Sequence, residues 1–543
     1  MKKRLLSLIL ALCIIISFSP STLAANLPEV DVRTEGLTPA QPQEAPAEKP
    51  RDAGAERRTI YVSNEGTEED DGATAETPTT LARATELANE GKKPVEIVVL
   101  GQVSVDTWTS PTVETTLRGG DENAELLFEY CSASDGAYNI SLADALTIDD
   151  IKFNCNYTDY FFSRYYGTYT IVANGYPLVI ASGVQCSYYT ADTIVDGKTC
   201  STSSCYVIGG GLDEDITGGT HVEIYTSLPL TYVYGGGVNG SVESNVYLHI
   251  ENCGKIQHVR AGGYANKKDA KVNGNITLDF INSVTDNPIY GGGYARSSYS
   301  AEVTGSICIN LSGLNNGFGR PIYGGGYGKN APVVGNIRFN ISNTKMNNNA
   351  AAIYGGGYNS DVTGDIFIHI KENSLISEET VWGGGTGDST ITGGVTITVD
   401  DSSEVIGEIR AGGNEGADVI GDVVITVSGG PQSACPTIFA TGKGEDEDNP
   451  AQVDGNVSIT LHGSRANVYT LDKFGEVTSD HTVTIILDDT DELSGAVRGD
   501  SKLDQHLYNH EKDNPTRTGN GASVIVKGDY TSTGCLLYTS DAA

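Results

Sequence analysis

The chain has 543 residues, of which 66 are glycine, and its 70 Asp and Glu residues against 35 Lys and Arg residues give a formal net charge of −35 at pH 7. We expect no nucleic acid as a partner, because a phosphate backbone is bound by basic surface. The same negative charge argues against binding of a naked polyuronate without calcium. The glycine content and the lack of sustained helical periodicity favour an all-β fold.

Residues 1–24 have the pattern of a secretory signal peptide. Lys2, Lys3 and Arg4 are basic, residues 5–18 are apolar, and a small-residue cleavage site ends at Ala24. The apolar stretch is too short to span a membrane comfortably. We therefore predict a secreted, extracellular or cell-surface protein with no membrane span in its mature part. Residues 25–58 are rich in Pro, Ala and Glu, which predicts a disordered linker.

Residues 59–205 are expected to form an N-terminal cap and irregular rungs. The segments Thr59–Ser63, Thr80–Ala84, Val95–Val99 and Ala145–Phe153 resemble, in this order, parts of secreted pectate-lyase-like proteins, which fold as right-handed parallel β-helices. The resemblance implies a first strand at Thr59–Ser63, a capping helix at Thr79–Asn89, a strand of the first rung at Val95–Val99 and a typical rung at Ala145–Phe153. The resemblance extends to about Leu487. It implies an architecture but no single activity, because that superfamily includes lyases, hydrolases, adhesins and passive stalks.

Residues 206–490 contain a nine-fold repeat. Its first half is an apolar residue, a large residue and three small residues, as in Ile322-Tyr323-Gly324-Gly325-Gly326, and the copies recur every 26 to 33 residues. The large residues are, in chain order, Ile208, Tyr234, Arg260, Tyr290, Tyr323, Tyr354, Trp382, Arg410 and Phe439. A repeat of this length predicts a solenoid.

The second half of each repeat alternates apolar or glycine residues with polar ones, as in Val362, Gly364, Ile366, Ile368 and Ile370. Strict alternation is typical of a strand with one buried face. The linkers between the two halves vary in length, which a solenoid tolerates at a corner. The sequence therefore predicts an all-β, single-stranded parallel β-helix (β-solenoid), right-handed by the resemblance, with an N-terminal capping helix and rungs of about 26–33 residues.

The aromatic residues of the repeat are the candidate binding site. Because side chains alternate between the two faces of a strand, Tyr290, Gly292 and Tyr294 are expected to point outward. Stacked rungs would then form two aromatic columns beside an exposed strip of glycine. The candidate glycan-binding residues are Tyr290, Tyr294, Tyr323, Tyr327, Tyr354, Tyr358 and Trp382, with Tyr264 at the start of the second column. Two compatible interpretations stay open: the rings form a platform for sugars, or a ladder that stabilises the coil.

We assign no catalytic residues and no metal ligands. The Asp-Asp pairs at 70–71, 149–150, 400–401 and 488–489 lie far apart and mostly at strand ends, where Asp suits turns. The histidines are expected in different rungs and slots, facing solvent: His221, His249, His369 and His462. Arg260 and Arg410 occupy equivalent slots five repeats apart, so we expect each to be stacked or salt-bridged at the surface.

The sequence contains few indications of a cofactor or a disulfide. The acidic run Gly444–Asn449 could hold calcium, but a solvated corner loop is the favoured interpretation because the run lacks the ligand order of an EF-hand. No Cys-x-x-Cys motif occurs, so no zinc site is expected. In the secreted context, a disulfide within the trio Cys186, Cys200 and Cys205 is a further hypothesis.

Residues 535–543 look like the translation of a sequencing adapter, so residues 491–534 are expected to be the last rungs of a truncated chain. Two classes of function stay open. The favoured one is a noncatalytic, adhesin-like β-helix that binds a polysaccharide or host glycan along an exposed Tyr/Gly face. The alternative is a carbohydrate-active enzyme, a polysaccharide lyase or glycoside hydrolase, which needs convergent acid and base groups in adjacent rungs. The sequence reveals no such set, and it does not determine the oligomeric state.

Overall fold

The structure is a computed structural model that describes residues 57–488, with short gaps, and two further strands at 497–498 and 522–527. The gaps are residues 129–137, 156–167, 187–193, 196–197, 200–203, 255, 316–317, 347–350, 378–379, 430–435, 447, 465, 471, 473 and 479–480. The predicted signal peptide, the linker up to residue 56, the segment 535–543 and Cys200 lie outside the described residues. The described residues belong to one compact unit, Ala55–Ala543.

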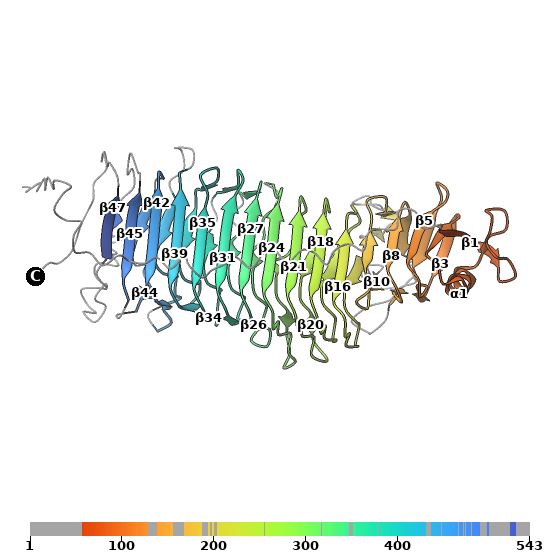
Figure 1. The fold of residues 1–543 in the computed structure, drawn as a ribbon, viewed down its shortest axis with the longest axis horizontal. Helices are drawn as coiled ribbons and strands as arrows, with labels where there is room; N and C mark the ends of the chain where they lie inside the picture. The colour runs from red at the N-terminus through yellow and green to blue at the C-terminus, as the bar shows by residue number, and fades with distance from the viewer. Residues whose placement is uncertain are drawn as a thin grey trace, which may run out of the picture. The chain divides into compact units, whose positions relative to one another are not determined.

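The described residues form parallel strands that stack as a β-solenoid, which confirms the predicted fold class. From β2 (Val95–Val99) onward, the strands of the two long sheets pair with the equivalent strand of the next rung rather than with their neighbour in sequence (Figure 1). The solenoid has about 11 turns. Within the spine of repeats, rung lengths run from 26 residues (Tyr234 to Arg260) to 33 (Tyr290 to Tyr323), as predicted.

Two sheets run the length of the described stack. The sixteen-stranded sheet consists of β1 (Arg58–Thr67), β2 (Val95–Val99), β5 (Thr115–Gly119), β8 (Leu146–Asp149), β11 (Leu178–Ile180), β16 (Thr220–Ile224), β18 (Val246–Glu251), β21 (Ile276–Ile281), β24 (Ile307–Ser312), β27 (Ile337–Ser342), β31 (Ile366–Lys371), β35 (Val395–Val399), β39 (Val423–Ser428), β42 (Val457–His462), β45 (Val483–Asp488) and β47 (Ala522–Lys527). The fourteen-stranded sheet consists of β4 (Trp108–Thr109), β7 (Ile140–Ser141), β10 (Thr168–Val172), β15 (Ser204–Ile208), β17 (Leu230–Tyr234), β19 (Ile256–Arg260), β22 (Ile289–Tyr290), β25 (Ile322–Tyr323), β29 (Ile353–Tyr354), β33 (Thr380–Trp382), β37 (Glu408–Arg410), β40 (Thr437–Phe439), β43 (Asn467–Tyr469) and β46 (Val497–Arg498).

The remaining sheets are shorter. A six-stranded sheet contains β26 (Val333–Val334), β30 (Val362–Thr363), β34 (Thr390–Thr392), β38 (Asp418–Ile420), β41 (Ala451–Asp454) and β44 (Gly475–Val477). A four-stranded sheet contains β3 (Gln102–Val105), β6 (Glu125–Phe128), β9 (Lys152–Cys155) and β12 (Gln185–Cys186), and a three-stranded sheet contains β28 (Lys345–Met346), β32 (Leu375–Ile376) and β36 (Glu404–Val405). The remaining pairs are β20 (Tyr264–Ala265) with β23 (Tyr294–Ala295), which is parallel, and β13 (Ile194–Val195) with β14 (Lys198–Thr199), which is antiparallel.

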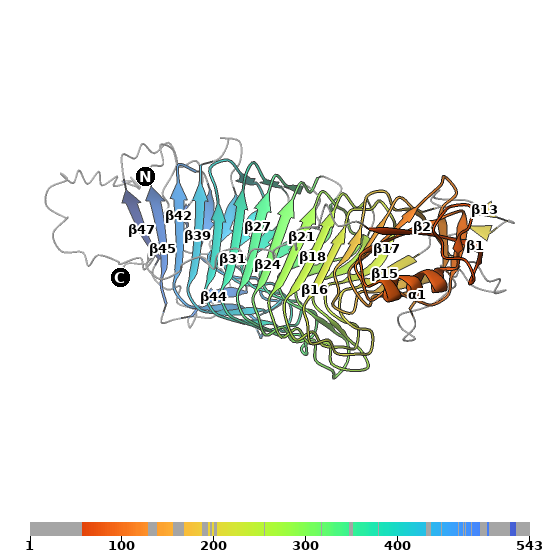
Figure 2. The ribbon, with the colours of Figure 1, turned by 45° about the vertical axis from the view of Figure 1, so that its right-hand side comes forward.

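The predicted N-terminal helix is present as α1 (Leu81–Gly91), displaced by two residues from the expected Thr79–Asn89. Thr80 is its N-cap and accepts a hydrogen bond from the backbone N–H of Arg83 at 3.1 Å. Trp108 Nε1 donates to Thr85 Oγ1 at 2.9 Å, which ties the helix to β4. Figure 2 shows α1 beside β1, at the N-terminal end of the stack.

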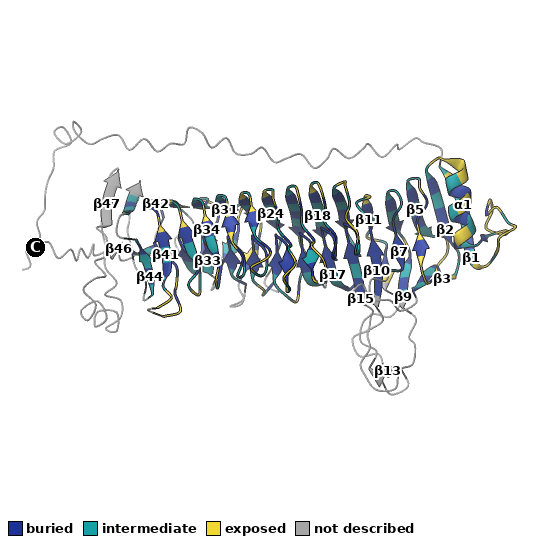
Figure 3. Ribbon diagram, turned by 90° about the horizontal axis from the view of Figure 1, so that it is seen from below, coloured by how far each residue is buried: buried dark blue, intermediate teal, exposed yellow. Residues whose placement is uncertain are grey.

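The core follows the predicted alternation. In β24, β27 and β31 every second residue is buried, and the register places Ile307, Ile337 and Ile366 in one column. Figure 3 shows the same pattern: buried residues follow the strands, while exposed residues gather on α1 and in corner loops. Within the described residues, no helix is long and apolar enough to cross a membrane.

Candidate functional site

The large residues of the repeat form a single column, which we call the aromatic spine. Strand pairing places each of them directly over its equivalent in the next rung. The spine contains Tyr234, Arg260, Tyr290, Tyr323, Tyr354, Trp382, Arg410, Phe439 and Tyr469. Between Tyr290 and Trp382 the rings lie nearly parallel, with centroids 5.1, 4.8 and 5.8 Å apart. The spine is therefore a continuous stack from Tyr290 to Trp382.

A second column runs beside the spine, and we call it the flanking column. Bridges between rungs place Tyr264, Tyr294, Tyr327 and Tyr358 in register. Tyr294 stacks on Tyr327 with centroids 4.3 Å apart, and Tyr327 stacks on Tyr358 at 5.1 Å. The flanking rings meet the spine edge to face, as where Tyr323 and Tyr358 lie at 89°. Edge-to-face contacts are a favoured arrangement of aromatic rings.

The two columns occur as predicted, but the expected exposed Tyr/Gly face is wrong at most of these positions. Five of the seven candidate side chains are only 4 to 9% exposed: Tyr290, Tyr294, Tyr323, Tyr354 and Trp382. Tyr327 and Tyr358 are half-buried. The rings are buried because each one packs against neighbours above, below and in the adjacent column. Ring faces that stack on one another cannot also stack on a sugar, so this geometry favours the ladder interpretation.

The glycine strip is also buried rather than open. A Cβ added at Gly292 would lie 2.8 Å from the backbone nitrogen of Gly326 in the next rung. The middle glycine of the repeat is thus required by the close approach of successive backbones. Its function is to let the rungs stack.

The tips of two spine tyrosines remain available to a ligand. Among the described residues, the hydroxyl groups of Tyr290 and Tyr323 have no hydrogen-bonding partner, and neither oxygen is sealed from solvent. Burial of the rings raises the pKa of both phenols, so both hydroxyls stay protonated. These hydroxyls can donate and accept hydrogen bonds at the surface.

The two spine arginines replace aromatic residues in the column and stack on aromatic neighbours. The guanidinium carbon of Arg410 lies 5.1 Å from the ring centre of Trp382 and 3.8 Å from that of Phe439. Arg260 lies over Tyr234 at 5.4 Å in the same way. A planar guanidinium can replace an aromatic ring in a stack. Both arginines are 4% exposed, so the predicted stacking is confirmed and the predicted surface location is wrong.

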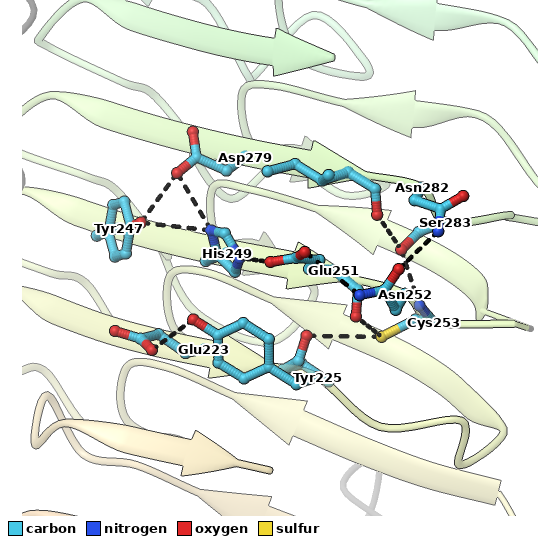
Figure 4. A network of polar contacts seen from close by, with 12 residues as sticks. Glu223, Tyr225, Tyr247, His249, Glu251, Asn252, Cys253, Asp279, Asn282 and Ser283 are labelled. Atoms are coloured by element: carbon cyan, nitrogen blue, oxygen red, sulfur yellow. Dashed lines mark hydrogen bonds and ion pairs between the residues drawn. The ribbon is translucent and has the colours of Figure 1, made fainter. Parts of the chain in front are cut away.

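A second candidate site lies on the outward face of the sixteen-stranded sheet, and we call it the His249 cluster: His221, Glu223, Tyr225, Tyr247, His249, Glu251 and Asp279. Figure 4 shows all of these residues except His221 with labels. Strand register places Glu223, His249 and Asp279 in the same slot of three successive rungs. His249 Nδ1 lies 3.3 Å from Asp279 Oδ2, and its Nε2 lies 3.2 Å from Glu251 Oε2. The cluster therefore combines carboxylates with an imidazole.

Hydroxyl and amide donors complete the His249 cluster. Tyr247 donates to Asp279 Oδ2 at 2.9 Å, and Asn310 donates to Asp279 Oδ1 at 2.6 Å. One rung away, Tyr225 donates to Glu223 Oε2 at 2.8 Å, and His221 Nε2 lies 2.6 Å from Glu223 Oε1. Each carboxylate is thus bonded on both oxygens.

These contacts shift the pKa values of the cluster. Burial disfavours the charged form of His249, but its hydrogen bonds to Asp279 and Glu251 outweigh burial and raise its pKa. Burial likewise opposes ionisation of Asp279, yet its bonds to His249, Asn310 and Tyr247 lower its pKa. The hydrogen bond to His221 lowers the pKa of Glu223. The arrangement favours ionised carboxylates next to a protonated imidazole.

The sequence did not reveal this cluster, because the histidines are expected at different positions of their strands. His249 and His369 in fact occupy the same outward-facing position of strands four rungs apart, and His221 occupies the next outward-facing position, one rung before His249. Aligning the alternating strands by their central outward residue would have brought Glu223, His249 and Asp279 together.

The other acidic candidates serve as turn residues. Asp149 Oδ1 accepts from the backbone N–H of Asp150 at 2.9 Å and of Gly183 at 3.2 Å. Asp400 accepts from the backbone N–H of Ser402 at 3.1 Å. In the acidic run Gly444–Asn449, where a solvated corner loop is the favoured interpretation, Asp446 Oδ1 accepts from the backbone N–H groups of Asp448 and Asn449. Over the described ranges, no group of three or more His, Cys, Asp or Glu residues is arranged to hold a metal ion.

Comparisons of the chain with protein-family models, with curated proteins and with solved structures found no match. The candidate sites therefore have to be interpreted from their own geometry.

Proposed function

We propose that the protein is a noncatalytic, adhesin-like β-solenoid, secreted or held at the cell surface, that binds glycans along the aromatic spine. Support for this proposal comes from one observation: Tyr290 and Tyr323 present hydroxyl groups, in adjacent rungs, that have no partner among the described residues. Buried tyrosines usually find a hydrogen-bonding partner for the hydroxyl. The predicted signal peptide supports an extracellular location, and the solenoid fold is compatible with the pectate-lyase-like resemblance.

The mode of contact differs from ring stacking on sugars. The faces of Tyr290 and Tyr323 are occupied by each other, with centroids 5.1 Å apart. A glycan would instead hydrogen-bond to the two hydroxyl tips, which lie in adjacent rungs about 4.8 Å apart. A pair of hydroxyl groups with this spacing suits a polymer with repeating hydroxyl groups.

Replacement of tyrosine by phenylalanine tests this proposal without disturbing the stack. We expect Tyr290→Phe combined with Tyr323→Phe to weaken glycan binding roughly tenfold, because two hydrogen bonds are lost while the rings remain. Binding is measured on a glycan array and then by calorimetry with the best ligand. Tyr299→Phe, which changes an exposed tyrosine outside both columns, is the matched control. Unchanged affinity in the double variant would refute the proposed contact.

A carbohydrate-active enzyme is the second candidate, and the His249 cluster favours it. Glu223 and Asp279 lie two rungs apart on either side of His249, so their strands are separated by about 9.5 Å. Hydrolysis of a glycosidic bond requires an acid and a base placed about the bond. In such a reaction an ionised carboxylate would act as base and the His249 imidazolium as acid.

Assays with polysaccharides distinguish the two candidates. A lyase produces ultraviolet absorbance from unsaturated ends when polyuronates are added, whereas a hydrolase releases reducing ends. If either signal appears, it should be lost in His249→Gln. If the purified chain releases neither product from a panel of acidic and neutral polysaccharides, the enzyme candidate fails and the binding proposal is unaffected.

A further inference from the structure

The two spine arginines have the same position in the repeat but different electrostatic surroundings. Arg410 has two carboxylate partners: Nε donates to Glu408 Oε2 at 2.8 Å and Nη1 donates to Asp472 Oδ2 at 2.5 Å. Arg260 donates from Nη1 to the hydroxyl of Tyr234 at 3.1 Å, and among the described residues it has no ion pair. A buried guanidinium is normally paired, because an unpaired charge is costly to remove from water. Arg260 therefore lacks the anions that Arg410 has.

One of the two missing partners can be traced to a single position. Glu408 precedes Arg410 by two residues on β37, and the residue that precedes Arg260 by two on β19 is His258. Burial, together with the positive charges of Arg260 and Arg296, lowers the pKa of His258 to about 4. His258 is therefore neutral at physiological pH and cannot supply a counter-charge. Instead it stacks on Tyr232, with centroids 4.4 Å apart.

A second guanidinium, that of Arg296, lies against Tyr294, on which Arg260 also packs. The guanidinium carbon of Arg260 is 3.5 Å from the ring centre of Tyr294, and that of Arg296 is 5.3 Å from it. Arg296 is exposed, donates from Nε to the hydroxyl of Tyr294 at 3.1 Å, and has no ion pair among the described residues. The unpartnered N–H groups of Arg260 are not sealed from solvent. Two unpaired positive charges thus meet in a chain whose net charge is −35.

We propose that Arg260 and Arg296 form a binding site for an anionic group, a carboxylate or a sulfate, carried by an acidic glycan. Arginine binds such groups through paired N–H donors, and the tyrosines around it limit competition from water. The choice of a glycan as the source of the anion rests on the proposed function, because Tyr290, which follows Arg260 in the spine, is one of the two proposed contact residues. The anion site itself rests only on the contrast with Arg410.

The substitution His258→Glu provides the sharpest test. It installs, in the Arg260 rung, the carboxylate that Glu408 supplies to Arg410. We expect wild-type protein to bind sodium glucuronate more strongly than glucose at matched ionic strength, measured by calorimetry and by the midpoint of thermal unfolding. His258→Glu should raise the midpoint in the absence of ligand and abolish the response to glucuronate, because the built-in carboxylate occupies Arg260.

Arg296→Gln is the second variant, and it changes an exposed residue, so folding is not at risk. We expect it to weaken glucuronate binding roughly tenfold, the usual loss for one charge-assisted hydrogen bond. Arg410→Gln is the matched control for a spine arginine that already has its anions, and it should leave the relative response to glucuronate unchanged. Sodium sulfate and an acidic oligosaccharide serve as further probes.

Each outcome decides the proposal. The site is refuted if glucuronate and sulfate bind no better than chloride, or if His258→Glu and Arg296→Gln respond like the wild type. If sulfate and glucuronate bind but the oligosaccharide does not, the anion site stands and the glycan source is wrong. If neutral glycans bind equally to wild type and Arg296→Gln but not to the double phenylalanine variant, the proposed function stands and the acidic ligand is wrong.

Discussion

The stacked spine predicts a large and specific cost for Tyr323→Ala. Tyr323 is 5% exposed, lies between Tyr290 and Tyr354 at 5.1 and 4.8 Å, and meets Tyr358 edge to face. Burial of about 200 Å² of this side chain at about 25 cal/mol per Å² corresponds to about 5 kcal/mol. A compact unfolded chain reduces this to about 3–4 kcal/mol. Each of the two stacked neighbours adds about 1 kcal/mol, so we expect a total loss of about 5–6 kcal/mol.

Urea unfolding followed by far-ultraviolet circular dichroism measures this loss. Tyr323→Phe keeps the ring and removes a hydroxyl that has no partner among the described residues, so it should change the free energy of unfolding by less than about 0.5 kcal/mol. Tyr299→Ala, at an exposed site, should also cost less than about 0.5 kcal/mol. A loss below about 1 kcal/mol for Tyr323→Ala, or equal losses for the alanine and phenylalanine variants, would refute a stabilising role for the stacked rings.

Two further predictions concern the glycine strip and the His249 cluster. Gly292→Ala should lower the free energy of unfolding by about 1–3 kcal/mol, because the added Cβ meets the backbone of the next rung, which cannot move aside. Gly218→Ala is the control: a Cβ there meets nothing within 4 Å, so this variant should be neutral or slightly stabilising in the same denaturation assay. Asp279→Asn should lower the pKa of His249 in an NMR titration, because it removes the carboxylate that raises it. Because the pKa of His249 is raised in the folded state, His249 stabilises the fold at pH values below its unfolded pKa, and this stabilisation is lost as the pH rises through its folded pKa. Because the pKa of Asp279 is lowered in the folded state, Asp279 stabilises the fold at pH values above its unfolded pKa, and this stabilisation is lost as the pH falls through its folded pKa. Thermal midpoints should therefore show the largest cost of Asp279→Asn between about pH 4 and pH 6.5, and a cost that does not vary with pH would contradict this account.

Rung length, strand direction and the aromatic columns could be predicted because they follow from local periodicity. The alternation around Ile366 specifies which side chains enter the core, and the recurrence of the Gly-Gly-Gly unit specifies the rung. The burial of Tyr323 could not be predicted in the same way. Alternation gives the direction of the Cα–Cβ bond, but whether the ring is exposed depends on the neighbouring column, here Tyr358, which meets it edge to face at 5.9 Å. A residue in the outward slot of a strand was therefore mistaken for an exposed residue.

The His249 cluster was missed for a different reason. Rungs differ by up to seven residues in length, so counting from the Gly-Gly-Gly units gives no common register for the second strand. The register of Glu223, His249 and Asp279 is set by hydrogen bonds between strands, which compensate for the variable corners. Without that register, three residues in one slot look like unrelated polar residues in separate rungs.

In this solenoid, residues that depart from the repeat are better candidates for function than residues that recur in every rung. In a stack, each residue's nearest neighbours are its own equivalents, so the ring faces of identical residues such as Tyr290 and Tyr323 pack on one another and stabilise the fold. Arg260 and Arg410 replace aromatic rings in the same column, yet among the described residues only Arg410 is paired with carboxylates. At Arg410 the chain supplies the counter-charges for a buried arginine in this position of the repeat. At Arg260 the described residues supply none, and this difference indicates a ligand more strongly than any feature present in every rung.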